Sequence, residues 1–336
     1  MTIFSNIKKP YIIAEIASAH YGNPNNIIKL VNESISAKSD AIKLQIFKVN
    51  NFVSKYNKNF NELKQIEIDY NNWLIIFKKL SKKKISFIAE IFDYESLLFA
   101  VNTNFFIAYK ISATCVYDTK IINYLCKKKL PTIIAIGGLD LVSVSKIYNK
   151  FKKNNLDFCL MFGHQNFPTK IEDLNLNKIK YLYNKYNITI GYADHVDAED
   201  FKYSFSIPLI AYTLGAKIIE KHININRSLK KNDYYSSLDP KEFKEFVYFM
   251  KNGINAFGNN RYEITNSEIN YNKFSKKYLV AANDIDSGEK LTIKNVDFKR
   301  TNSIGITEYK FNKSLKNQII NKNIKKDKMI LLKDIL

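Results

Sequence analysis

The histidines are the first residues whose positions indicate chemistry. The 336-residue chain contains only four, His20, His164, His195 and His222, and each comes just after a short apolar segment that is predicted to be a strand. A lone histidine in such a place is more often structural. All four in equivalent places, however, indicate a common site.

His195 and His222 follow successive predicted strands, in the runs Gly191-Tyr192-Ala193-Asp194-His195 and Glu220-Lys221-His222. Both imidazoles could therefore face one ion, with Glu15 of the first predicted strand across the seam of a closed sheet. Two imidazoles, a carboxylate and water suit Mn, Co, Zn or Fe and leave positions open for a substrate oxygen.

Two lysines, Lys43 and Lys110, stand among apolar neighbours in predicted strands. An inward-facing lysine in a closed sheet needs an anion. One interpretation is an ion pair with Glu15 or Glu90. The other is the capture of a substrate carboxylate or phosphate, or a Schiff base with a carbonyl substrate.

The elements that position these residues form a repeated pattern. Eight apolar, β-branched segments alternate with amphipathic stretches of helical spacing, and they cover residues 11–15, 41–46, 86–91, 108–111, 132–136, 158–162, 189–192 and 217–221. Eight such units favour a (β/α)8 TIM barrel, in which active-site residues lie at the carboxyl ends of the strands.

The pattern changes towards the C-terminus. A last barrel helix is expected from Asp239-Pro240 to about residue 257, ending at Gly258, so the barrel domain spans 1–258. An Asn-rich polar linker follows over 259–276. Residues 277–336 are predicted to form a small α+β module, with strands near 278–282 and 297–300, too small to own much core.

Composition excludes several classes of protein. No apolar run is long enough to span a membrane and residues 1–10 lack the pattern of a signal peptide, so we expect a cytoplasmic protein without a membrane partner. The net charge of +20 is not focused on one element, which argues against nucleic acid as a partner. Three cysteines without C-x-x-C spacing are expected to be buried free thiols.

Several motifs together resemble the sialic acid synthase (N-acetylneuraminate synthase) family along nearly the whole chain. They are Ile13-Ala14-Glu15-Ile16 with His20 and Gly22, Asp40 to Gln45, Tyr109 to Ser112, Phe167-Pro168-Thr169, Gly191 to His195, and Glu220-Lys221-His222. The C-terminal module resembles that family's antifreeze-like (SAF) domain. The resemblance implies a cytoplasmic transferase that condenses phosphoenolpyruvate with an N-acylated aminosugar, giving a nonulosonic acid and phosphate for surface glycan biosynthesis.

The resemblance also implies roles for individual residues. His195 and His222 would bind a divalent metal, Mn²⁺ first and Mg²⁺ or Co²⁺ as alternatives, with Glu15 and Asp233 nearby. Lys43 and Lys110 would clamp the carboxylate of phosphoenolpyruvate. Further substrate contacts would come from Gln45, Ser112, Gln165, Phe167 and Arg300. Arg300 would act from the partner subunit of a domain-swapped homodimer.

The chain departs from the family pattern at several substrate positions. Ala113, Ala135 and Ala193 replace small hydroxyl residues of the phosphate grip, Glu90 replaces a Thr, and Cys115 replaces a sugar-contacting Glu. Ser112, Thr114, Gly137-Gly138 and His164 could compensate as donors. Two alternatives therefore stay open: the same metal barrel with other aldolase or lyase chemistry, and a carbohydrate-binding relative that has lost turnover.

Overall fold

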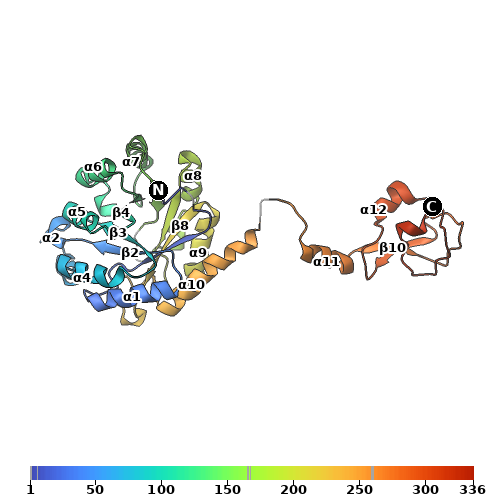
Figure 1. The fold of residues 1–336 in the computed structure, drawn as a ribbon, viewed down its shortest axis with the longest axis horizontal. Helices are drawn as coiled ribbons and strands as arrows, with labels where there is room; N and C mark the ends of the chain where they lie inside the picture. The colour runs from blue at the N-terminus through green and yellow to red at the C-terminus, as the bar shows by residue number, and fades with distance from the viewer. Residues whose placement is uncertain (1, 6, 165, 167, 259–260) are drawn as a thin grey trace. The chain divides into compact units, whose positions relative to one another are not determined.

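The computed structural model describes residues 2–5, 7–164, 166, 168–258 and 261–336 (Figure 1). The chain divides into two compact units, residues 1–258 and 259–336. Each unit is described by itself.

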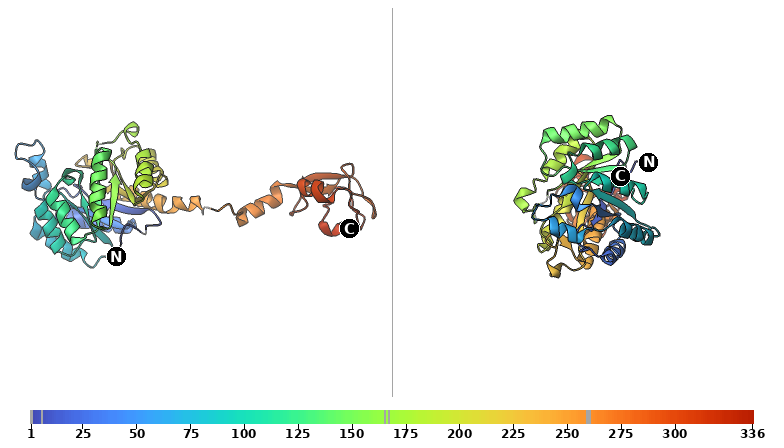
Figure 2. Two further views of the ribbon diagram at one scale, coloured as in Figure 1. Left: turned by 90° about the horizontal axis from the view of Figure 1, so that it is seen from above. Right: turned by 90° about the vertical axis from the view of Figure 1, so that its left-hand side faces the viewer.

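The first unit is a closed parallel barrel ringed by helices (Figures 1 and 2). Its strands are β1 (Tyr11–Glu15), β2 (Ala41–Ile46), β3 (Ser86–Ile91), β4 (Ala108–Ile111), β5 (Thr132–Ala135), β6 (Phe158–Phe162), β7 (Ile190–Asp194) and β8 (Ala216–Ile223). Neighbours in sequence pair in parallel, and β1 pairs with β8 to close the sheet. The predicted TIM barrel is confirmed, and the predicted strand bounds shift by at most two residues.

The helices follow the strands in the predicted alternation. They are α1 (Pro24–Ser36), α2 (Val49–Phe52), α3 (Phe60–Ile66), α4 (Tyr70–Leu80), α5 (Tyr94–Asn102), α6 (Thr119–Lys128), α7 (Leu141–Lys153), α8 (Asn177–Tyr186), α9 (Phe201–Thr213) and α10 (Pro240–Gly253). Several begin at an Asp side chain that accepts a hydrogen bond from the first turn, such as Asp140 from the Ser143 amide at 2.7 Å. A short strand, β9 (Ser237–Leu238), pairs with the end of β8.

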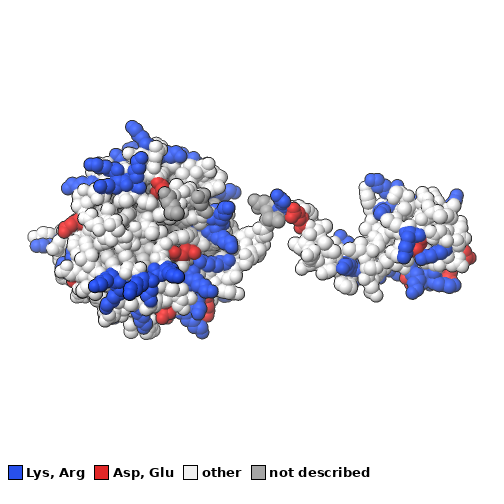
Figure 3. All heavy atoms as spheres, viewed as in Figure 1, with Lys and Arg blue, Asp and Glu red and all other residues white. Residues whose placement is uncertain are grey.

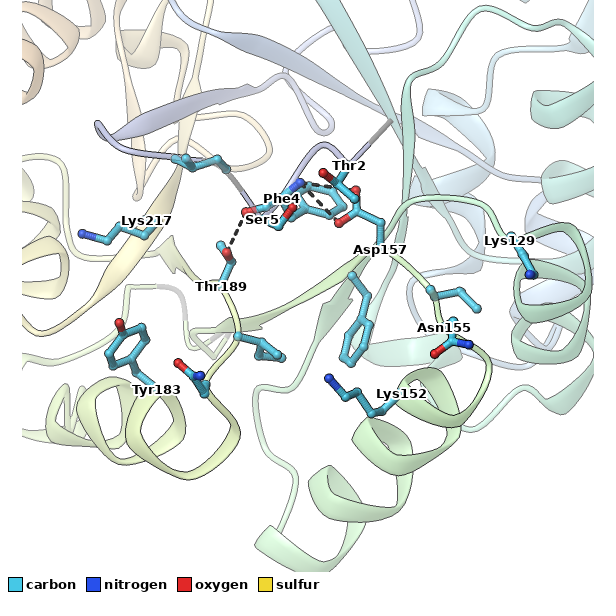
Figure 4. A pocket seen from close by; sticks show the side chains of 15 residues that line it. Thr2, Phe4, Ser5, Lys129, Lys152, Asn155, Asp157, Tyr183, Thr189 and Lys217 are labelled. Atoms are coloured by element: carbon cyan, nitrogen blue, oxygen red, sulfur yellow. Dashed lines mark hydrogen bonds between the residues drawn. The ribbon is translucent and has the colours of Figure 1, made fainter.

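Alternating strand residues build two cores. Outward side chains pack against the helices, and inward ones fill the barrel with a smaller cluster that includes Ile13, Ile88 and Ile218. Phe4, only 1% exposed, closes the amino end of the barrel as part of this inner cluster. Its segment is fixed by Asp157, which accepts the amides of residues 3 and 4, and by Thr189, whose hydroxyl donates to the Phe4 carbonyl at 2.7 Å (Figure 4).

The second unit contains α11 (Asn266–Ser275), β10 (Lys277–Ala281), β11 (Val296–Arg300) and α12 (Glu308–Lys310). The two strands are antiparallel, and the unit has a core of its own around Leu279, Leu291 and Phe311, so the prediction of little core is wrong. Helix α11 lies inside the segment predicted to be a polar linker. The Thr265 and Glu268 side chains cap its first turn reciprocally, a signal that the Asn-rich composition obscures.

Lys and Arg side chains are spread over the visible faces of both units in several groups (Figure 3). Within the residues that the structure describes, no helix has the length and apolarity needed to cross a membrane.

Candidate active site at the carboxyl ends of the strands

Five charged side chains meet inside the barrel. They are Glu15 of β1, Lys43 of β2, Glu90 of β3, Lys110 of β4 and Glu220 of β8, and each is at most 4% exposed. The strand register brings them together, because Glu15 is paired with Lys43 and Glu90 with Lys110. Inward-facing positions near the carboxyl ends of neighbouring strands converge in this fold.

The two lysines share their anions. One oxygen of Glu220, Oε1, lies 2.8 Å from Lys43 Nζ and 2.7 Å from Lys110 Nζ. Glu90 is 2.6 Å from Lys43 and 3.4 Å from Lys110, and Lys43 also pairs with Glu15. The ion-pair interpretation of the lysines is therefore what this structure shows.

Mutual attraction favours the charged forms of Glu90, Lys110 and Glu220, whereas burial lowers the pKa of Lys43. Burial alone would raise the pKa of Glu220, but Lys110 and Lys43 hold it at about 2. The same two lysines overcome burial and lower the pKa of Glu90. Burial opposes the charge of Lys110, yet Glu220 and Glu90 raise its pKa, so Lys110 is an ammonium and a poor Schiff-base nucleophile.

The two predicted metal ligands lie side by side. His195 follows β7, His222 is on β8, and their Nε2 atoms are 3.4 Å apart. Burial lowers the pKa of His195 to about 3 and that of His222 well below its usual range, so both rings are neutral. Two nitrogens bound at about 2.0–2.1 Å to one tetrahedral ion would be separated by about 3.4 Å. The pair fits a metal site in donor type, charge and spacing.

Glu15 and Asp233, the two acids predicted to lie near the metal, have other partners in the structure. Glu15 is paired in register with His222, but its carboxylate contacts Lys43 and accepts the Ala17 amide at 2.6 Å. Asp233 accepts the Ser18 amide at 3.0 Å, and burial raises its pKa. Among the described residues, no three His, Cys, Asp or Glu side chains converge as metal ligands.

The remaining predicted contacts are only partly brought together. Gln45 donates to Glu90 at 3.3 Å, and Ser112 is buried just after β4. Gln165 and Phe167 lie outside the described residues. Arg300 is exposed at the end of β11 in the second unit.

Two of the positions that depart from the family pattern, Cys115 and Glu90, have protein partners in the structure. Cys115 is a packed thiol, 5% exposed, that donates to the Phe92 carbonyl at 2.9 Å, and burial raises its pKa to about 11. Glu90 has the lysine partners that a second carboxylate here requires. Gly137, Gly138 and His164, expected as compensating donors, line one cavity of about 940 Å³ beyond β5 and β6.

Glu220 was not among the residues predicted to act, although it contacts both lysines. The signal was present in the sequence. Glu220 stands two positions before His222 on the same strand, so both side chains face the barrel interior.

Comparisons with known proteins identify the family of the chain. The NeuB family model matches residues 30–262. Pseudaminic acid synthase of Campylobacter jejuni is 29% identical over 337 residues, covering 96% of this chain and 95% of that protein. N,N'-diacetyllegionaminic acid synthase of Legionella pneumophila is 25% identical over 301 residues, covering 84% and 83%. The solved structure of an N-acetylneuraminic acid synthetase from Leptospira borgpetersenii superposes with a TM-score of 0.72 at 27% identity, covering 80% and 93%. The chain therefore belongs to the NeuB family.

Proposed function

We propose that the barrel condenses phosphoenolpyruvate with an N-acylated aminosugar to give a nonulosonic acid and phosphate, as a step in surface glycan biosynthesis. The observation that carries the proposal is the buried group of Lys43, Lys110, His195 and His222 at the carboxyl ends of the strands. The relatives support it, because their names are those of pseudaminic, legionaminic and sialic acid synthases.

In this proposal the lysines bind and orient the enol substrate. Lys43 and Lys110 lie 2.8 and 2.7 Å from the same oxygen of Glu220, which orders both ammonium groups before a substrate carboxylate binds beside them. The C3 carbon of the enol forms the new bond to the sugar aldehyde, whose oxygen takes up a proton. Water then adds at C2 and gives up a proton, and the C2–O bond to phosphate breaks, which leaves a ketone at C2 and releases phosphate.

The histidines would hold a divalent ion, Mn²⁺ first and Mg²⁺ or Co²⁺ as alternatives, which when bound supplies Lewis acidity to the aldehyde. Asp233 is the protein's own proton source in this proposal. It would donate to the aldehyde oxygen that becomes a hydroxyl, and burial favours its protonated form by raising its pKa. Glu15 would orient water and Lys43 near this site.

Arg300 is assigned to the sugar's acyl group, acting from the partner subunit of a domain-swapped homodimer. It is exposed in its own unit, where the described contacts give it no structural task. We expect deletion of residues 277–336 to weaken sugar binding and the dimer together. A truncated protein that stays dimeric with an unchanged KM for the sugar would remove Arg300 from the site.

The direct test is phosphate release by the purified protein with Mn²⁺, phosphoenolpyruvate and a panel of N-acylated hexosamines that includes di-N-acetylated 6-deoxy sugars. Release that requires a sugar and is abolished by a chelator is expected. Metal-loaded protein that releases no phosphate with any sugar would instead favour aldolase or lyase chemistry on another carbonyl substrate. The alanines at 113, 135 and 193 are the observation that keeps this second candidate open.

A non-catalytic carbohydrate-binding role is the weaker candidate. Five buried charges and two buried neutral imidazoles are costly to hold in a barrel interior. A protein that only bound sugar on its surface would have no use for them.

A further inference from the structure

A second buried ion pair joins the strands of the two predicted metal ligands, β7 and β8, on the face of the sheet that points away from the barrel interior. Asp194 of β7 and Lys221 of β8 are each 0% exposed, and Lys221 Nζ is 2.5 Å from Asp194 Oδ2. Inward-facing Ala193 and Glu220 precede them, so strand alternation turns Asp194 and Lys221 outward, towards the helices. The pair therefore does not face the space in which substrates would react.

Other buried side chains contact both members of this ion pair. The Tyr192 hydroxyl donates to the other oxygen of Asp194 at 3.0 Å, and Tyr192 is itself 1% exposed. The ammonium of Lys221 lies 5.9 Å from the centre of the Phe246 ring on α10. Both carboxylate oxygens and the ammonium thus have described partners.

A buried ion pair of this kind is poorly explained by stability. Removing two charges from water costs about as much as their attraction returns, and well-packed apolar residues often replace such a pair without loss. Buried pairs are best attested as devices that specify a register, and a specific register is needed here. The pairing of β7 with β8 is irregular between Ile190 and Gly191, so the register beyond this point must be set again.

The ion pair sits where that register matters. Asp194 and Lys221 are paired directly in the sheet, and each is the residue immediately before a histidine of the candidate metal site. A slip of one residue would turn one imidazole to the other face of the sheet. We propose that Asp194 and Lys221 are positioning residues that fix the ends of β7 and β8 so that the Nε2 atoms of His195 and His222 lie 3.4 Å apart.

This inference rests on the proposed function for its purpose, but its test does not need turnover. The double variant Asp194→Asn/Lys221→Met removes both charges at nearly constant volume, whereas either single change would leave an unpaired buried charge. The matched control is Ile219→Val, because Ile219 is fully buried on the same outward face of β8, two residues before Lys221. Urea unfolding establishes that each variant is folded.

The first measurement is the ¹H–¹⁵N spectrum of the imidazole nitrogens in metal-free protein, which is simple because the chain has four histidines. The signals are assigned with single His→Gln variants. In the double variant we expect the His195 and His222 signals to shift or broaden while those of His20 stay unchanged, and no such change in Ile219→Val. Unaltered His195 and His222 signals in the folded double variant would overturn the inference.

The second measurement is the affinity for Co²⁺, followed by its visible absorption. Loss of a group that orients a metal ligand typically weakens metal binding about 10–100-fold, which is the increase in Kd expected for the double variant. A Kd within twofold of wild type would count against the positioning role. If Co²⁺ binding to the wild type does not depend on His195 or His222, the metal proposal fails, while the imidazole spectra still decide the inference.

Discussion

Replacement of Glu90 by Gln should strengthen the binding of phosphoenolpyruvate. The five charged groups inside the barrel comprise three carboxylates and two ammonium groups, so Glu90 makes the site net negative where an anionic substrate must bind. The amide is isosteric. Lys43 keeps Glu15 and Glu220 as partners and Lys110 keeps Glu220, so the fold should survive the change.

The size of the effect follows from the geometry. Glu90 lies 2.6 Å from Lys43 Nζ, so a substrate carboxylate bound to the same ammonium would come within about 5–6 Å of it. At an effective dielectric constant of about 20, two charges at that distance repel by about 3 kcal/mol. Looser lysines in the variant offset part of this gain, so we expect at least about a tenfold lower Kd.

Calorimetric titration of metal-loaded protein with phosphoenolpyruvate measures this Kd. The matched control is Glu67→Gln, which makes the same change in charge in a carboxylate that pairs with Lys48 and Lys64 instead of the interior lysines. An unchanged or higher Kd in folded Glu90→Gln, with Glu67→Gln equal to wild type, would refute the reasoning. Glu90 would then be a structural partner of the lysines.

Three further outcomes are expected. His222→Ala should lose tight Mn²⁺ binding, measured by equilibrium dialysis. If the variant still binds Mn²⁺ tightly, the assignment of the metal site to His195 and His222 is wrong. Burial lowers the pKa of His20 from 6.5 to about 4, so the unfolded chain takes up this proton at a higher pH than the folded protein does. Between pH 7.5 and 5 the free energy of unfolding should therefore drop about 2 kcal/mol more in wild type than in His20→Gln. The same dependence of the free energy of unfolding on pH in both proteins would contradict this. Phe4→Ala should lower the free energy of unfolding in urea by about 3–5 kcal/mol, and a loss under 1 kcal/mol would show that Phe4 does not seal the barrel.

Much of the barrel could be predicted because the signals for its elements are local. Buried β-branched segments such as 41–46 and 86–91 are bounded by polar turns, and they coincide with β2 and β3 exactly as the structure places them. Helix α11 was missed because a capping box over four residues is a weaker signal than the Asn-rich composition around it. No apolar stripe marks this helix, and none of its residues is buried.

Part of the candidate site could be predicted as a set of neighbouring residues, but its network of contacts could not. The place of His195 and His222 after consecutive strands implies that they are neighbours, and they are. That Lys43 and Lys110 would share one oxygen of Glu220 depends on side-chain geometry across a closed sheet, which spacing along a chain does not encode. The Asp194–Lys221 pair is likewise not encoded by spacing, because each residue directly precedes a histidine that is the stronger candidate in the sequence.

The charges of the site also explain why lysines and histidines occur together in it. The carboxylates outnumber the ammonium groups by one, and His195 and His222 add no charge because burial keeps them neutral. The lysines alone therefore cannot make the interior attractive to a substrate with several negative charges. A divalent cation held by the two imidazoles would reverse the sign of the site without any change in protonation. Under the proposed function, the carboxylates would keep the lysines ordered before substrate arrives, and the imidazoles would hold the positive charge that lets it bind.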